Sequence, residues 1–284
     1  MLLPGFIIRR CAMEGILFLG GDKRIIYAAE HISRSSEVCA EGLGERFSPP
    51  SGRYSRIVLP LPFSRDGVNI NAPLSAEPLP LDIIPRLAER GALVLSGGTS
   101  PALERLCADN GLRLRDYFSG EELTLKNALL TAEGAMSLLI TETDYALFDS
   151  SALILGYGRI AFYLARLLRA FRCRVTIAAR NPVQREKALL DGFCSLPTEL
   201  AGLAAESSDL VINTVPAALL TEYCFHRMRD SALYLELATR SARPEKDWAE
   251  AADIKYVNGS GLPGRFTPRT AGEAIAETIT AAWD

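Results

Sequence analysis

The sequence contains only two histidines, and none of its apolar stretches approaches the length of a membrane-spanning helix. Such a helix takes about 20 consecutive apolar residues. At the start of the chain the apolar pattern is broken by Arg9, Arg10 and Glu14, and no basic residue precedes it as in a secretory signal peptide. We therefore expect a cytoplasmic protein that does not bind membranes.

A strong excess of one charge is also absent. The 31 Lys and Arg residues stand against 34 Asp and Glu residues, which gives a formal net charge of −3. Because nucleic-acid binders draw affinity from cations that neutralise phosphates, this balance disfavours nucleic acid as a partner. The six cysteines are scattered without a Cys-x-x-Cys pair, so the sequence indicates neither a zinc site nor a disulfide-rich scaffold, and we predict no bound metal.

Short apolar runs alternate with helix-like stretches along the whole chain, which is typical of α/β proteins with parallel sheets. We predict two doubly wound parallel-sheet domains. Residues 1–145 form a flavodoxin-like domain for substrate or partner, and residues 146–284 form a Rossmann domain that binds NAD(P). Packing of the C-terminal helix, residues 270–283, back on the first domain stays open.

A long helix is predicted over residues 120–143, because apolar residues recur there at spacings of three and four. The other expected helices are 23–33, 81–90, 100–110, 160–171 and 183–190. The expected strands are 15–19, 56–61, 92–95, 112–115, 152–155, 174–178, 209–214, 231–237 and 254–257.

A glycine-rich segment directly follows one predicted strand and directly precedes an amphipathic helix, which is the context of a dinucleotide-binding fingerprint. Gly156 permits the tight turn, Gly158 lets the backbone approach a pyrophosphate, and Ala161 in the third glycine's place still allows close packing. The helix N-terminus offers N–H groups and partial positive charge to phosphates. The predicted pyrophosphate-binding residues are Gly156, Tyr157, Gly158, Arg159 and Ile160.

The next predicted strand ends without an acidic residue. An NAD enzyme usually has Asp or Glu there to bond the ribose 2′-hydroxyl, whereas an arginine accommodates a 2′-phosphate. Arg180 stands at this tip, and a guanidinium can make paired hydrogen bonds to phosphate oxygens. We therefore predict NADP as the cofactor, with its 2′-phosphate near Ala179, Arg180, Asn181 and Arg185.

A polar turn, Asn213-Thr214-Val215-Pro216-Ala217, follows a further predicted strand, and Thr214, Val215 and Pro216 are its candidate cofactor-binding residues. We predict that it passes beside the nicotinamide ribose, and a plain strand-to-helix turn is the alternative. The 2-hydroxyacid dehydrogenases have a similar layout but use a late histidine paired with a carboxylate. Residues 259–272 contain no histidine, and His226 lies too early, so that mechanism is disfavoured.

Residues 259–272 instead read as a turn-rich loop with two arginines before a helix that starts near Thr270. Cations and N–H groups gathered there would suit a carboxylate.

Several segments together resemble the A-subunit of dipicolinate synthase, over nearly the whole chain from about Gly15. The segments are residues 20–24 (Gly-Gly-Asp-Lys-Arg), 127–135, 155–159, 179–180, 213–216 and 261–272. Thr-Ala-Glu-Gly-Ala at 131–135 and Gly-Leu-Pro-Gly at 261–264 are the most specific. Ala161, where a glycine is usual, and the divergent residues 38–54 depart from the family pattern.

The resemblance implies a role in making dipicolinate in the mother cell of a spore-former, together with a flavoprotein-like B-subunit of dipicolinate synthase. The implied substrate is a small cyclic dicarboxylate, 4-hydroxy-tetrahydrodipicolinate, which loses water and is oxidised with NADP to dipicolinate. Its two carboxylates call for cations and N–H groups. The candidate substrate-binding residues are Gly21, Lys23, Arg24, Ser96, Gly97, Thr131, Gly261, Pro263, Gly264, Arg265, Arg269 and Thr270.

Asp22 and Glu133 are our acid–base candidates, because each is expected at a domain edge. A helix cap is the alternative for Asp22, and a solvated helix-surface charge is the alternative for Glu133.

Two other functions stay open. One is a reductase of another small carboxylate, similar to shikimate dehydrogenases, although Lys23 and Asp22 are wrongly spaced for their Lys–Asp pair. The other is a protein that holds the cofactor and is active only with the B-subunit. A homo-oligomer also stays open.

Overall fold

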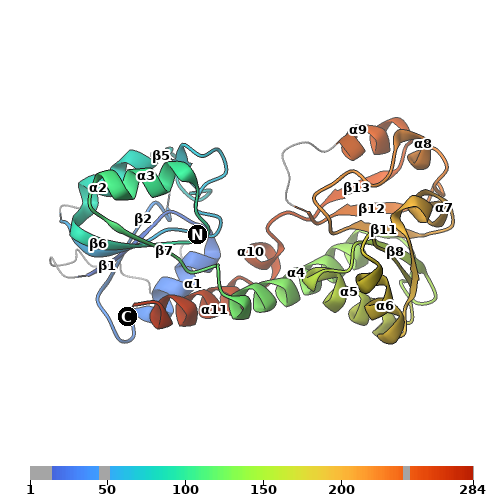
Figure 1. Ribbon diagram of the computed structural model, residues 1–284, viewed down its shortest axis with the longest axis horizontal. Helices are drawn as coiled ribbons and strands as arrows, with labels where there is room; N and C mark the ends of the chain where they lie inside the picture. The colour runs from blue at the N-terminus through green and yellow to red at the C-terminus, as the bar shows by residue number, and fades with distance from the viewer. Residues whose placement is uncertain (1–14, 45–51, 239–243, 284) are drawn as a thin grey trace. The chain divides into compact units, whose positions relative to one another are not determined.

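The computed structural model describes residues 15–44, 52–238 and 244–283, and Figure 1 shows their helices and strands. The chain forms two compact units: the first runs to Lys126 and resumes at Thr267, and the second is Asn127–Phe266. The expected α/β class with two parallel-sheet domains is confirmed. The division differs from the predicted boundary at 145/146, because the long helix is shared between the units and the last helix belongs to the first.

The first unit is built on a five-stranded parallel sheet in the order β2-β1-β3-β6-β7. Counted along the chain, these strands follow the order 2-1-3-4-5 of flavodoxin-like folds. Its elements are β1 (Ile16–Leu19), α1 (Lys23–Ile32), β2 (Val38–Glu41), β3 (Tyr54–Val58), β4 (Asn69–Ile70), β5 (Leu79–Pro80), η1 (Leu81–Ile83), α2 (Ile84–Leu87), β6 (Ala88–Ser96), α3 (Pro101–Asp109), β7 (Arg113–Asp116), the start of α4 (Glu121–Glu142) and α11 (Pro268–Ala281).

The second unit is built on a six-stranded parallel sheet in the order β10-β9-β8-β11-β12-β13, which is the 3-2-1-4-5-6 order of a Rossmann domain. The rest of α4 belongs to this unit. Its other elements are β8 (Ser151–Leu155), α5 (Arg159–Ala170), β9 (Arg174–Ala178), α6 (Pro182–Leu190), β10 (Cys194–Leu196), η2 (Thr198–Leu200), α7 (Ala201–Glu206), β11 (Leu210–Asn213), α8 (Glu222–Phe225), β12 (Leu233–Glu236), α9 (Pro244–Ala251), β13 (Lys255–Asn258) and α10 (Leu262–Phe266).

Two sequence-based predictions of local structure are wrong. The helix expected over residues 81–90 ends at Leu87, and β6 begins at Ala88, which pairs with Tyr54. Gly91 has a φ of +75°, which a helix does not allow but a strand irregularity does. The turn-rich loop expected over residues 259–272 contains the short helix α10, and α11 already begins at Pro268, a favoured first helical position for proline.

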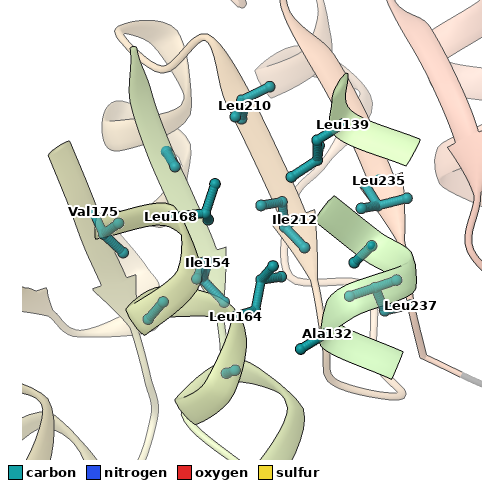
Figure 2. Packing of buried hydrophobic residues seen from close by; sticks show 14 of the residues in the cluster. Ala132, Leu139, Ile154, Leu164, Leu168, Val175, Leu210, Ile212, Leu235 and Leu237 are labelled. Carbon is teal, nitrogen blue, oxygen red and sulfur yellow. The ribbon is translucent and has the colours of Figure 1, made fainter. Parts of the chain in front are cut away.

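One side of the second unit's sheet is covered by α4 and α5. Leu139 of α4 and Leu164 and Leu168 of α5 belong to the same buried cluster as Ile154 of β8 and Ile212 of β11, and Figure 2 shows this packing. The spacing of three and four residues that predicted α4 therefore marks a face that is buried.

In the first unit, α11 packs on α1. A Cβ atom on Gly272 would lie 2.5 Å from the carbonyl oxygen of Arg24 and 2.6 Å from Cβ of Tyr27. The glycine therefore allows the two helix backbones to approach closely. Among the residues that the structure describes, no helix is both long and apolar enough to span a membrane.

Candidate functional site

The candidate site of the second unit lies where its strand order reverses, between β8 and β11. The last residues of these two strands, Leu155 and Asn213, are register partners, so the segments that follow them leave the sheet side by side. Ligands of open α/β sheets bind at this carboxyl edge, at the point where the strand order reverses. The glycine-rich segment and the turn after Asn213 are therefore brought together, as the fingerprint requires.

The two fingerprint glycines differ in what they accommodate. Gly156 has a φ of +93°, and a Cβ atom there would lie 2.5 Å from Cγ1 of Val215. Gly158, the residue before α5, has an ordinary φ of −89°, and a Cβ atom there would meet no described atom within 4 Å. Packing within the protein explains glycine at 156 but not at 158, which leaves space in front of the first turn of α5. That turn begins with the exposed Arg159 and the half-buried Ile160.

The turn after β11 is fixed by a buried pair of polar side chains. The Thr214 hydroxyl donates to the carbonyl of Leu155 (2.7 Å), and the Val215 N–H donates to Oδ1 of Asn213 (3.1 Å). The Asn213 amide in turn donates to Glu236 of β12 (3.0 Å), and both residues are fully buried. Pro216 is exposed.

Sequence reasoning placed Asn213 at the start of the polar turn but did not identify Glu236 as its partner. The available signal was an acidic residue at the end of an apolar strand, Leu-Tyr-Leu-Glu, since a charged side chain is rarely buried without partners.

At the end of β9, three of the predicted 2′-phosphate residues have different roles. Asn181 caps α6 by accepting a hydrogen bond from the Val183 N–H (2.9 Å). Arg185 donates to the carbonyls of the buried Ala179 and of Arg180 (2.9 Å each), so its guanidinium supports the strand end. Arg180 is exposed, and within the described ranges it makes no side-chain hydrogen bond or ion pair. Its guanidinium is thus available for an anion at the N-terminus of α6.

The side chain of Tyr157 points into the second unit rather than toward solvent. Its hydroxyl donates to Oδ2 of Asp191 at 2.6 Å. Burial raises the pKa of the Tyr157 phenol, and the hydrogen bond to Asp191 and that carboxylate's charge raise it further. The phenol therefore stays protonated and engaged within the protein, and Tyr157 can serve a ligand only through its backbone.

In the first unit, Asp22 and Arg24 form a largely buried ion pair at the start of α1. Asp22 caps the helix by accepting from the Arg24 N–H (3.0 Å), and its two oxygens also accept from the Arg24 guanidinium at 2.9–3.1 Å. Arg24 Nη2 also donates to the carbonyl of Leu61 (2.5 Å). The helix cap that was the alternative for Asp22 is therefore present, and the Arg24 guanidinium already has partners inside the unit.

The neighbouring candidates of the first unit are mostly structural in their contacts. A Cβ atom on the buried Gly21 would lie 2.5 Å from the Ile25 side chain, and one on Gly97 would lie 2.5 Å from the carbonyl of Pro60. The Gly97 N–H donates to that carbonyl (3.2 Å), and the buried Ser96 hydroxyl donates to the carbonyl of Gly98 (2.6 Å). Lys23, by contrast, is exposed next to the ion pair.

The two most family-specific segments pack against each other within the second unit. A Cβ atom on Gly134 of α4 would lie 2.7 Å from Cβ of Leu262 in α10. Thr131 is buried and donates to the carbonyl of Asn127 (2.7 Å), whereas Glu133 is exposed. The Gly-Leu-Pro-Gly segment therefore holds α10 on α4.

The other late candidates lie in α10, in the turn before it and at the start of α11, and they differ in exposure. Gly261 has a φ of +68°, Pro263 is buried and Gly264 is half-buried. Arg265 donates to the carbonyl of Asn258 (3.3 Å) and belongs to the second unit. Arg269 belongs to the first unit, where it pairs with Glu273 of the same helix (3.1 Å), and Thr270 beside it is exposed.

A flavodoxin-like sheet combined with a Rossmann domain is the fold of two-domain NAD(P)-dependent dehydrogenases. A D-lactate dehydrogenase from Escherichia coli superposes with a TM-score of 0.63 at 13% identity, covering 94% of this chain and 95% of that one. The class of fold is therefore that of a dehydrogenase that uses a nicotinamide cofactor.

The family is more specific. Residues 15–118 match the family described as the N-terminal domain of the dipicolinate synthase A-subunit. The A-subunit of dipicolinate synthase from Bacillus subtilis (strain 168) is 29% identical over 188 residues, which is 66% of this chain and 63% of that protein. The crystal structure of the corresponding protein from Bacillus halodurans superposes with a TM-score of 0.79 at 22% identity, covering 95% of this chain and 97% of that one. The resemblance to the A-subunit of dipicolinate synthase is confirmed by this family match and by these two similar proteins.

Proposed function

We propose that this protein is the nicotinamide-dependent component of a dipicolinate synthase, which binds NADP and forms dipicolinate from 4-hydroxy-tetrahydrodipicolinate. The observation that carries the proposal is the glycine-rich site of the second unit, in a chain whose first unit matches the A-subunit of that synthase. The glycine-rich site alone does not distinguish this function, because many dehydrogenases share the fingerprint. The match of the first unit is what narrows the proposal to a dipicolinate synthase.

The residues present fit a dinucleotide that carries a 2′-phosphate. The first turn of α5 has N–H groups without intrahelical partners, and the missing side chain at Gly158 leaves room for a pyrophosphate there. Arg180 supplies a guanidinium at the start of α6, and no acidic side chain ends β9 to bond a free 2′-hydroxyl. These features support NADP over NAD.

The proposed reaction needs no strong base. Loss of water from the hydroxylated ring gives a dihydropyridine, and removal of one hydride and one proton then makes the ring aromatic, which favours this oxidation and the conversion as a whole. When bound, NADP accepts the hydride. The protein's task is then to bind two carboxylates and to accept a proton. In the second unit, Arg265 is an exposed cation that suits the first task. In the first unit, Lys23 is exposed, whereas Arg24 already has Asp22 as its partner.

Glu133 is the stronger of the two acid–base candidates. Its carboxylate is exposed on α4, whereas both carboxylate oxygens of Asp22 accept hydrogen bonds from Arg24. The Asp22 carboxylate is thus already engaged in holding Arg24 and capping α1. We assign Asp22 to holding the start of α1 and Glu133 to proton transfer.

The family description, which names one component of a larger synthase, supports a second protein as the partner. We propose that this protein binds the B-subunit of dipicolinate synthase, and that both act in the mother-cell cytoplasm of a spore-former. The partner's contribution decides between an enzyme that is active alone and a protein that only holds the cofactor.

The test is NADPH formation from freshly generated 4-hydroxy-tetrahydrodipicolinate, followed at the NADPH absorbance with and without the B-subunit. Shikimate with NADP is the control for the reductase alternative. Activity of the protein alone supports the proposal as stated, and activity only in the presence of the partner assigns this chain the role of holding the cofactor. Turnover of shikimate, or no turnover of the cyclic dicarboxylate in either case, contradicts the proposed function.

A further inference from the structure

The residue between the two fingerprint glycines has a buried, hydrogen-bonded side chain. Tyr157 is 7% exposed, its hydroxyl donates to Asp191 at 2.6 Å, and its ring packs edge-on against Phe193 with the ring centroids 6.3 Å apart. A pyrophosphate cradle is made by backbone N–H groups and needs no side chain at this position. The side chain of Tyr157 therefore adds a restraint that the fingerprint itself does not require.

Asp191 extends this restraint to two helices. It follows α6 directly, its Oδ1 accepts from Arg166 of α5 (2.8 Å), and its carbonyl accepts from Arg169 of α5 (2.6 Å). The Arg166 guanidinium in turn lies over the ring of Phe162, 3.5 Å from its centroid. Asp191 thus links the glycine-rich segment to α5, whose N-terminus faces the site. It also links that segment to the end of α6, which begins beside Arg180.

The segment that is held has little rigidity of its own. Glycine accesses more backbone conformations than any other residue, so the order of the chain on both sides of Tyr157 depends on tertiary contacts, such as the hydrogen bond from the Gly156 N–H to the carbonyl of Ala178 (2.7 Å). Ordering such a segment when a ligand binds opposes binding entropically, and a segment that is already ordered avoids that loss. An internal anchor at Tyr157 has this effect.

We infer that Tyr157 and Asp191 are positioning residues, which hold residues 156–158 in the conformation that receives the pyrophosphate of a nicotinamide dinucleotide. The inference rests on the proposed cofactor binding. It assigns Asp191, which lies 34 residues from Tyr157 in the sequence, to a site that it does not line.

The experiment compares Tyr157→Phe with Tyr145→Phe. Tyr145 is a matched control, because it belongs to the same unit and its hydroxyl likewise donates one hydrogen bond, to the carbonyl of Asp209 (2.9 Å), just before β11 at the opposite edge of the sheet. Dissociation constants for NADPH, NADH and 2′-AMP are measured by fluorescence and calorimetric titration, and thermal midpoints are recorded for each variant. 2′-AMP lacks the pyrophosphate and reports on the 2′-phosphate side alone.

For Tyr157→Phe we expect the NADPH dissociation constant to rise about tenfold, equivalent to about 1.4 kcal/mol, while that of 2′-AMP changes less than twofold. Tyr145→Phe should lower the thermal midpoint by about as much as Tyr157→Phe does, and it should leave the dissociation constants for NADPH and 2′-AMP unchanged. Asp191→Asn should weaken NADPH binding, and the double variant Tyr157→Phe/Asp191→Asn should be no weaker than the weaker single variant.

Equal NADPH affinities for the two phenylalanine variants, or equal loss of NADPH and 2′-AMP, would overturn the inference. The proposed cofactor binding is tested separately, by the affinities of the wild-type protein for NADPH and NADH. If the wild type prefers NADH, the NADP assignment fails and the tyrosine comparison is made with NADH and adenosine. If the wild type binds neither dinucleotide, both proposals fail.

Discussion

Gly156 and Val215 lie so close together that a Cβ atom on Gly156 would stand 2.5 Å from Cγ1 of Val215. Close approach of the segments after β8 and β11 therefore requires glycine at 156, in addition to its φ of +93°. Two residues later, at Gly158, the protein makes no such demand. The fold explains glycine at 156, whereas only the proposed pyrophosphate would explain glycine at 158.

Alanine substitutions at 156 and 158 should have different effects, one mainly on stability and the other mainly on NADPH binding. Gly156→Ala should lose about 2 kcal/mol or more of unfolding free energy, since overpacking and a left-handed backbone both oppose it. Gly158→Ala should stay within about 1 kcal/mol of the wild type, as for a modest change at a helix start, yet bind NADPH at least tenfold more weakly. Urea unfolding and fluorescence titration measure the two effects. Normal NADPH binding by Gly158→Ala would count against a pyrophosphate at this site.

Arg180 should decide between the two dinucleotides. Arg180→Ala should raise the dissociation constant for NADPH by about tenfold to a hundredfold, in line with loss of a charge-assisted bond worth about 1.5–3 kcal/mol, and should hardly change that for NADH. Arg185→Ala is the control, because its guanidinium bonds the carbonyls of Ala179 and Arg180. It should lower stability and weaken both cofactors alike. Equal effects of Arg180→Ala on both cofactors would contradict the NADP assignment.

Replacing Asp22 by asparagine should leave the buried Arg24 guanidinium without its charged partner. The Arg24 side chain is 8% exposed and that of Asp22 is 24% exposed, so Asp22→Asn should cost about 2 kcal/mol, less than the roughly 3–5 kcal/mol of a fully buried pair. Asparagine retains the helix cap. Adding Arg24→Met removes the stranded charge and should restore much of the stability, as measured by urea unfolding.

Asp22→Asn and Asp22→Asn/Arg24→Met, compared with Glu133→Gln, also test which carboxylate transfers the proton. The measurement is NADPH formation from 4-hydroxy-tetrahydrodipicolinate. If Asp22 only holds α1, turnover should recover with stability in Asp22→Asn/Arg24→Met, and Glu133→Gln should lower turnover without loss of stability. Turnover that stays low in the stabilised double variant would return the acid–base role to Asp22.

The contact between Gly134 and Leu262 should be sensitive to one methyl group. A Cβ atom on Gly134 would lie 2.7 Å from Cβ of Leu262, so Gly134→Ala should destabilise the protein by about 1–3 kcal/mol. Gly120→Ala, where a Cβ atom would meet nothing within 4 Å, is the matched control. A double-mutant cycle with Leu262→Gly, which removes that Cβ atom, should show coupling between 134 and 262 in urea unfolding, and strict additivity would argue against this contact.

Acid sensitivity of the second unit should depend on Asp209. Burial by itself would raise the pKa of this carboxyl, but hydrogen bonds from Ser151 and the ion pair with Arg229 outweigh it and lower the pKa. Because the pKa is lower in the folded than in the unfolded protein, where it is about 3.9, the stabilisation is complete above the unfolded value. It is lost as the pH falls from there through the folded value.

The urea midpoint of the wild type should therefore fall more steeply below about pH 5 than that of Asp209→Asn, since the variant has already lost this linkage. Asp230→Asn, which removes an exposed carboxylate of the same unit, is the control. Parallel acid limbs for the wild type and Asp209→Asn would contradict the assignment.

Local pattern was sufficient for much of the fold. The strand-glycine-helix order placed β8, Gly156 and α5 correctly, because each signal lies within a few adjacent residues. The three- and four-residue spacing located α4 to within a residue at each end. The absence of an acid after β9 and the position of Arg180 at its tip were likewise readable from the sequence, and the structure leaves that arginine exposed.

Pairing between distant segments was decided only by the tertiary structure. The sequence suggests Arg24 as a substrate-binding cation, but the fold buries its guanidinium against the carbonyl of Leu61, 37 residues away, as well as against Asp22. Glu236 ends an apolar strand and Asp191 follows a helix, but only the adjacent strand ends and the packed helices bring them to Asn213 and Tyr157. The chemistry of a single segment can be inferred from its own residues, whereas hydrogen-bond partners follow from burial, which the whole chain determines.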